Sequence, residues 1–218
     1  MQQGSANDKV EALLKEIDTA SVSINHVPIE KLDRLVRSNH QGIIAIASPI
    51  EFANLEDVVA SSLESDKAPL FLILDQVSDV RNFGAILRTA ECTGVDAVII
   101  QKKGGAPVSG DTVKASAGAI FNVPICKVDH IKDAIYYLQG SGIKTIAATE
   151  KSKTSLYDLK LNEPIAFIMG SEGRGVSGSV LSLADEKASL PLLGKINSLN
   201  VSVACGALLY EVIRQRQL

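Results

Sequence analysis

The chain has 218 residues, of which 46% are hydrophobic and 22% charged, and its formal net charge is −3 at pH 7. This length suffices for a buried core and one or two domains of an ordinary globular protein. The small negative charge argues against a protein that binds nucleic acid mainly through bulk positive charge, although a local basic patch can still do so. No apolar run reaches the length of a membrane span and no secretory signal pattern is present, so we expect a cytoplasmic protein without a membrane partner.

Cysteine and histidine are too few and too scattered for a disulfide framework or a metal site. We therefore expect no metal. Two of the cysteines, Cys92 and Cys205, lie among small and apolar residues, which predicts buried, unreactive thiols.

The first 47 residues read as a small α/β unit. Apolar residues at helical spacing predict helices over residues 8–17 and 28–36, and alternating or continuous apolar residues predict strands over 21–24 and 43–47. A unit of fewer than fifty residues buries too little apolar surface to form a large core of its own. The next segment, 48–68, is rich in Glu, Asp and Ser, and we interpret it as a linker with a possible helix at 55–63.

From residue 69 to 218 strands and helices alternate, which predicts a single α/β domain built on a parallel sheet. Continuous apolar runs indicate strands that are buried on both faces. The expected strands are 70–74, 97–100, 123–126, 144–148, 165–169 and 189–192, and the expected helices are 83–92, 112–118, 131–138 and a last one that starts near Ser198 or Asn200.

Three polar segments follow buried strands or precede the last helix. In the first, Asn82 and Arg88 stand six residues apart near the carboxyl end of a strand, where ligands of α/β proteins bind. Taken alone, Asn82 could cap a helix and Arg88 could be a solvated helix arginine.

The second segment, Gly170-Ser171-Glu172-Gly173-Arg174-Gly175, is a glycine-rich turn that lets a ligand approach the backbone closely. One alternative is a phosphate-binding loop, but the carboxylate of Glu172 would repel phosphates and suits a cationic cofactor or a substrate hydroxyl better. A plain turn with an exposed glutamate is the simplest alternative.

The third segment runs from Leu190 through Ser198, Leu199 and Asn200 into the last helix. Small polar residues at a helix start cap free backbone N–H groups, so capping alone would explain Ser198 and Asn200.

Together, in this order and at these spacings, the three segments resemble the three motifs of the SpoU family, also called the TrmH family, in the SPOUT class. Members of this family are RNA ribose 2′-O-methyltransferases that use S-adenosylmethionine. The resemblance implies a SPOUT fold with a deep trefoil knot near the C-terminus, a homodimer, and catalysis without a metal.

The resemblance also implies roles for particular residues. Arg88 matches the arginine that is essential to catalysis, and backbone at Gly170, Leu190 and Leu199 matches the cofactor-binding positions. The remaining expected active-site residues are Asn82, Glu172, Ser198 and Asn200.

The N-terminal unit is similar to part of an RNA-binding lobe of the ribosomal protein L30e type, with its first helix and strand missing. Relatives with this lobe methylate a guanosine of 23S rRNA, so rRNA is the favoured substrate and tRNA the second. Two other hypotheses stay open: a non-catalytic RNA-binding or ribosome-assembly module, and an unrelated nucleotide-binding protein.

Overall fold

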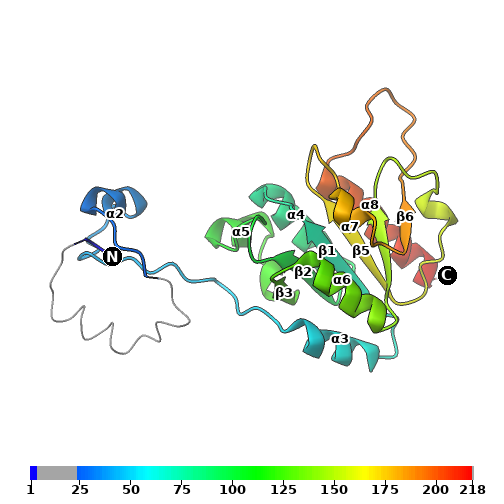
Figure 1. Cartoon of the computed structure of the whole chain (residues 1–218), viewed down its shortest axis with the longest axis horizontal. Coiled ribbons are helices and arrows are strands. Elements are labelled where there is room, and N and C mark those ends of the chain that lie inside the picture. Colours follow the sequence, from blue (N-terminus) through cyan, green and yellow to red (C-terminus); the bar gives the residue numbers. More distant parts are fainter. Residues whose placement is uncertain (4–23, 218) are drawn as a thin grey trace. The chain divides into compact units, whose positions relative to one another are not determined.

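The computed structural model describes residues 1–3 and 24–217, which form two compact units, Met1–Ala47 and Ser48–Leu218 (Figure 1). The helix expected over 8–17 and nearly all of the strand expected over 21–24 lie outside the described residues. No helix in the described part of the chain is both long and apolar enough to span a membrane.

The first unit contains one described helix, α2 (Ile29–Leu35), close to the predicted 28–36. Leu32 is its buried residue, and a bridge between Gln2 and Val27 ties the N-terminus to the segment before the helix. The strand predicted over 43–47 is wrong, because these residues have no ladder partner among the described ones and Ile46 is 88% exposed. An apolar β-branched run favours an extended backbone, but it becomes a strand only where another strand pairs with it.

The second unit is built on a six-stranded sheet in which all neighbouring strands are parallel, which confirms the predicted fold class. The strand order is β3-β2-β1-β5-β4-β6. The strands are β1 (Leu70–Asp75), β2 (Ala97–Gln101), β3 (Ile125–Val128), β4 (Lys144–Ala148), β5 (Ile165–Gly170) and β6 (Glu186–Ala188). Parallel strands need crossover helices, so both faces of such a sheet are covered.

Successive side chains of the central strands point to opposite faces of the sheet and pack in two separate hydrophobic cores. Leu70, Leu72 and Leu74 of β1 pack on one face with α4 (Val80–Cys92) and α8 (Val201–Gln217). Phe71 and Ile73 pack on the other face with α3 (Leu55–Leu63), α6 (Ile131–Gly140) and the short α7 (Gly178–Leu181). The remaining elements are α5 (Gly110–Ala115), η1 (Ala119–Phe121) and η2 (Leu156–Asp158). The result is a three-layer α/β/α unit (Figure 1).

Helix α3 begins and ends as predicted within the segment interpreted as a linker. Leu55 and Val59 are buried in the second core, so this segment packs on the sheet. The division of the chain at residues 47 and 68 stays our proposal. The trefoil knot likewise stays a prediction.

Two further predictions near the sheet need correction. The last strand covers Glu186–Ala188 and not 189–192, where Pro191 has no N–H to donate and the chain leaves the sheet. Cys92, expected to be buried, is exposed at the end of α4, whereas Cys205 is buried and its pKa is raised to about 12 by desolvation, which keeps its thiol protonated.

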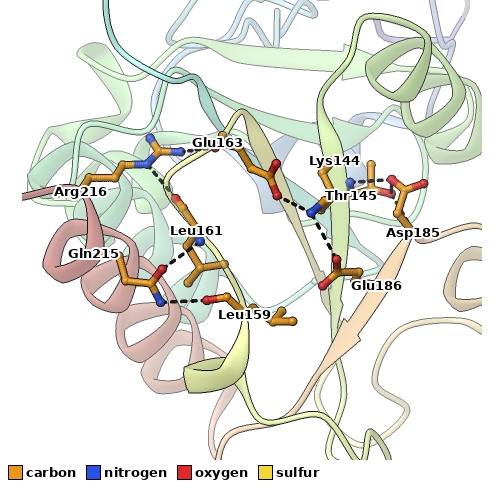
Figure 2. Close-up of polar contacts among 9 residues, drawn as sticks. All are labelled: Lys144, Thr145, Leu159, Leu161, Glu163, Asp185, Glu186, Gln215 and Arg216. Atoms are coloured by element: carbon orange, nitrogen blue, oxygen red, sulfur yellow. Dashed lines mark hydrogen bonds and ion pairs between the residues drawn. The ribbon is translucent and has the colours of Figure 1, made fainter.

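The amino ends of the strands are held by a polar network (Figure 2). Lys144 at the start of β4 forms ion pairs with Glu163 and Glu186, which precede β5 and open β6. Beside them, Oδ2 of Asp185 accepts hydrogen bonds from the backbone N–H and the hydroxyl of Thr145, both at 2.8 Å. These contacts fix the edge strand β6 against β4.

Asp185 should make stability depend on pH. Partial burial acts to raise the pKa of this carboxyl, but hydrogen bonds from Thr145 and Gln139 outweigh it and lower the pKa below its usual 3.8. The contribution of a carboxyl with a lowered folded pKa is complete above its unfolded pKa and is lost as pH falls through the folded pKa. We expect Asp185→Asn to destabilise the protein at pH 7, by a difference that shrinks below about pH 4.

Urea unfolding of wild type and variant between pH 7 and 3 measures this difference. Asp158→Asn is the matched control, because its carboxylate has no hydrogen-bond partner among the described residues. A difference that stays constant down to pH 3 would contradict the proposed role of Asp185.

Candidate active site

Helix α4 begins three residues before the predicted start. Asn82 is therefore not the N-cap, and its side chain is available for other contacts. The side chain of Asp79 caps the helix by accepting from the backbone N–H of Asn82 at 2.9 Å. Asn82 therefore lies in the first turn, and its own side chain is not the cap. Gly84 lies two residues further along α4, where a Cβ atom would come within 2.4 Å of Ala115, so glycine permits the close packing of α4 on α5.

The glycine-rich segment after β5 is a tight hairpin turn. The backbones of Ser171 and Gly175 exchange two hydrogen bonds, and Gly173 and Gly175 have positive φ angles of 85° and 68°. A Cβ on Gly170 would lie 1.9 Å from the backbone of Gly175, so only glycine allows the chain to fold back here. This turn places Glu172 and Arg174 on the outside.

Buried Asp75 holds this turn against the sheet. It ends β1, is 3% exposed, and its Oδ2 accepts from the backbone N–H of Ser177 at 2.7 Å. Sequence analysis did not select Asp75, although a carboxylate at the carboxyl end of a buried strand is a signal that could have drawn attention to it.

The side chain of Asn200 both caps α8 and contacts the other two polar segments. Its Oδ1 accepts from the backbone N–H groups of Ser202 and Val203, so it caps α8, which confirms the predicted capping. Its Nδ2 donates to Oε1 of Glu172 at 2.7 Å and to Oδ1 of Asn82 at 3.0 Å. One residue thus fixes the start of the last helix and links all three polar segments.

Asn82 completes the triangle by donating from Nδ2 to the same Oε1 of Glu172 at 2.6 Å. The three residues are separated by up to 118 positions in the chain, yet their side chains are in direct contact. Oε2 of Glu172 has no hydrogen-bond partner in the part of the chain that the structure describes. The triangle therefore leaves one carboxylate oxygen open to a ligand.

A cavity of about 510 Å³ opens beside this triangle. Its lining includes six of the eight expected site residues: Gly170, Glu172, Leu190, Ser198, Leu199 and Asn200. It also includes residues that sequence analysis missed, among them Thr149 and Glu150, which follow the carboxyl end of β4. The position of that strand end was predicted and could have revealed them.

Of the two expected residues that do not line the cavity, Asn82 contacts Glu172 and Asn200 at its rim, whereas Arg88 contacts no other expected residue. It lies on the exposed side of α4, does not line the cavity, and its side chain forms no salt bridge or hydrogen bond within the described residues. Its distance along the helix from Asn82, nearly two turns, accounts for this separation.

The volume fits a small organic cofactor, since ligand sites of proteins usually measure about 300–1,000 Å³. Apolar Met169, Leu190 and Leu208 offer contact area, and the turn at Gly170 lets the ligand approach the backbone. Glu172 offers a negative group toward a positively charged ligand. In the described residues no three His, Cys, Asp or Glu side chains gather as a metal site.

Comparison with known proteins identifies the family. Residues 69–210 match the model of the SpoU rRNA methylase family, and residues 1–53 match that of RNA 2′-O ribose methyltransferase substrate binding. The chain belongs to the SpoU rRNA methylase family. It is an RNA methyltransferase that uses S-adenosylmethionine, with an RNA-substrate-binding N-terminal region.

Relatives of this methylase match three quarters of the chain or more. A putative TrmH family tRNA/rRNA methyltransferase of Bacillus subtilis is 34% identical over 214 residues, 98% of this chain and 84% of the relative. The TrmH/SpoU tRNA modifying enzyme of A. aeolicus is 30% identical with a TM-score of 0.63, covering 75% of this chain and 82% of that one. The SpoU methyltransferase AviRb of Streptomyces viridochromogenes, solved with AdoMet, is 20% identical and has a TM-score of 0.69 over 98% of this chain and 81% of its own, which supports the fold.

Proposed function

We propose that the methylase transfers the methyl group of S-adenosylmethionine to a ribose 2′-OH of RNA. Guanosine in 23S rRNA is the first candidate target and tRNA the second, and cytoplasm is the compartment where both occur. The observation that carries this proposal is the contact of Asn82, Glu172 and Asn200 at the rim of a cofactor-sized cavity.

Backbone and apolar groups around Gly170, Leu190 and Leu199 would hold the cofactor in this cavity. When bound, the cofactor supplies an electrophilic methyl group on a positively charged sulfur. Glu172 lies at the same cavity, so its negative charge favours a cationic ligand over a phosphate.

A ribose hydroxyl is a poor nucleophile at neutral pH and has to be oriented and polarised. In our proposal Oε2 of Glu172 accepts a hydrogen bond from the ribose 2′-OH and so orients and polarises it. The side-chain amides of Asn82 and Asn200 donate to Oε1 and hold the carboxylate in place. Ser198 lines the same cavity and contacts the RNA. Preorganised groups of this kind lower the barrier because they need no reorientation during the reaction.

Arg88 acts from outside the cavity, on the phosphate next to the target ribose. A guanidinium binds phosphate with two parallel hydrogen bonds. A general-base role would need a neutral guanidine near pH 7, which costs about 9 kcal/mol for a pKa near 13.8. Stabilisation of the developing alkoxide by positive charge avoids that cost.

The roles of Arg88 can be separated by two variants. We expect Arg88→Ala to reduce methyl transfer by about 100-fold or more, and Arg88→Lys to recover only part of it, because lysine lacks the planar fork. The affinity for S-adenosylhomocysteine should stay unchanged, since Arg88 does not line the cavity. Full activity of Arg88→Ala would exclude an essential role.

The function itself is tested by two assays on the full chain. Calorimetry should detect binding of S-adenosylhomocysteine, and tritiated methyl transfer to unmodified 23S rRNA or tRNA transcripts, followed by nuclease mapping, should place the label on a ribose. Label on a base would contradict the proposed 2′-O position, and cofactor binding without transfer to either RNA would favour a non-catalytic module.

We also propose a homodimer. The outer side of α8 exposes Val203 and Tyr210, 58% and 57% accessible, and a second copy would cover this apolar surface. A monomeric mass by light scattering at micromolar concentration would contradict it.

A further inference from the structure

Exposed cations stand along one edge of the sheet, one after each of five strands. Lys103 follows β2, Arg81 lies in the first turn of α4 after β1, and Arg174 follows β5. Lys151 follows β4 and Lys195 follows β6. Because all strands are parallel, these positions share the carboxyl edge, and the strand order places them in a row.

These five residues, which we call the edge cations, keep their charge unpaired. None of them has a salt bridge or a side-chain hydrogen bond within residues 1–3 and 24–217. Four carboxylates of the same edge also have partners other than the edge cations: Asp129 pairs with Lys102, while Asp75, Asp79 and Glu172 accept from neutral N–H groups and keep their negative charge. Two further carboxylates near this edge are exposed: Glu150, and Asp111, which lies 4.0 Å from Nζ of Lys114.

The opposite edge of the sheet differs. There Lys144 is neutralised by Glu163 and Glu186, and the guanidinium of Arg216 is directed at backbone carbonyls (Figure 2). Although the net charge of the whole chain is −3, the five unpaired cations offer local positive groups to a ligand at the carboxyl edge.

The row is continuous with the cavity. Arg174 and Lys151 line it on two sides, from the loops after β5 and β4. Neighbouring strands lie about 4.8 Å apart, so the four steps from β2 to β6 span about 19 Å, the length of several nucleotides of single-stranded RNA.

We propose that the edge cations bind the phosphate backbone of the RNA strand whose target ribose enters the cavity. Arg174 and Lys151 hold phosphates close to that ribose, in addition to the one assigned to Arg88, and Arg81 and Lys103 hold phosphates further along the strand. This inference rests on the proposed function. A linear row of exposed, unpaired cations that runs into the active-site cavity fits a polyanionic strand, because each phosphate can pair with one cation.

The test uses fluorescein-labelled oligouridylate of twelve nucleotides and the full chain, with binding followed by anisotropy between 50 and 200 mM NaCl. The decisive variant combines Arg81→Gln and Lys103→Gln, because neither residue lines the cavity. The matched control combines Lys67→Gln and Lys160→Gln, two exposed lysines near the other edge that have no ion pair among the described residues.

Each phosphate contact on a single strand contributes about 0.7 to the slope of log affinity against log salt. We expect the decisive variant to lower this slope by about 1.4 and to weaken binding several-fold at 50 mM NaCl. The control should match wild type, and all proteins should bind S-adenosylhomocysteine equally.

The proposal is overturned if the decisive variant keeps the wild-type slope, if the control loses as much affinity, or if wild type does not bind the oligonucleotide at 50 mM NaCl. Failure of the proposed function looks different: wild type would then fail to bind S-adenosylhomocysteine or to label RNA, whatever the salt slopes are.

Discussion

Asn200→Asp is expected to reduce methyl transfer by about 100-fold or more while leaving α8 capped. Aspartate caps a helix as well as asparagine does, because its oxygen accepts the same backbone N–H groups. It cannot donate to Glu172, and it places a second carboxylate where the amide lay 2.7 Å from Oε1. Removal of a preorganised donor costs about 10²–10³ in rate in other enzymes. Single-turnover transfer of labelled methyl to the RNA substrate measures the loss.

The same variant should respond to pH in a way that wild type does not. Two carboxylates in contact raise the pKa of one of them, so at lower pH the pair shares a proton and an O–H donor replaces the lost amide. The rate ratio of Asn200→Asp to wild type should therefore rise between pH 8 and 5.5. Asn200→Ser is the matched control, since it keeps a capping oxygen and adds no charge. An Asn200→Asp enzyme with more than a third of wild-type activity at pH 8 would show that the triangle is structural only.

The interior of the second unit was predictable, because segments that are buried on both sides have continuous apolar sequences. Strand β4 and helix α3 have the predicted bounds, and β1 and β5 extend one residue beyond them. Continuous apolar runs occur where both faces of a strand are covered, so the pattern identifies the strand and its depth together.

Pairing partners were not predictable in the same way. Residues 43–47 are as apolar as the real strands, yet the described part of the chain offers them no ladder. Residues 189–192 include two leucines, but Pro191 interrupts them and only Ser189 forms a bridge, with Ser155. The pattern of apolar residues in a sequence indicates which side chains prefer burial. A strand also needs backbone hydrogen bonds to a second segment, which can be distant in the chain and leaves no sign in the first.

The site was predictable as a set of segments but not as a geometry. The motifs indicated Asn82, Glu172 and Asn200, and capping was a competing explanation for Asn200. The structure shows that capping and contact with Glu172 use different atoms of one amide, so the two explanations are compatible. Arg88 illustrates the opposite case: it lies six residues, nearly two helical turns, from Asn82 along α4 and does not line the cavity.

Arg216→Ala is expected to lower the free energy of unfolding by about 3 kcal/mol, the largest stability effect that we predict from a single side chain. Arg216 stands near the end of α8, and its guanidinium donates to the carbonyls of Ala68, Pro69, Leu161 and Glu163. These carbonyls precede β1 and β5, the two central strands (Figure 2 shows those of Leu161 and Glu163). The carbonyl of Pro69 also accepts from the backbone N–H of Ile165, whereas the other three have no backbone donor among the described residues. A partly buried carbonyl that loses its donor costs about 1 kcal/mol or more.

Arg216→Lys should recover little of this loss, because an ammonium group on a flexible stem cannot reach four carbonyls that a planar fork serves together. Urea unfolding of both variants gives the free energies, and Gln217→Ala controls for its position on the helix, since Gln217 is exposed and forms no side-chain hydrogen bond in the described structure. A loss below about 1 kcal/mol for Arg216→Ala would mean that water replaces the guanidinium at these carbonyls. The last helix would then be held to the sheet mainly by its apolar residues, among them Leu208, Leu209 and Val212, and by the hydrogen bonds of Gln215 with Leu159 and Leu161.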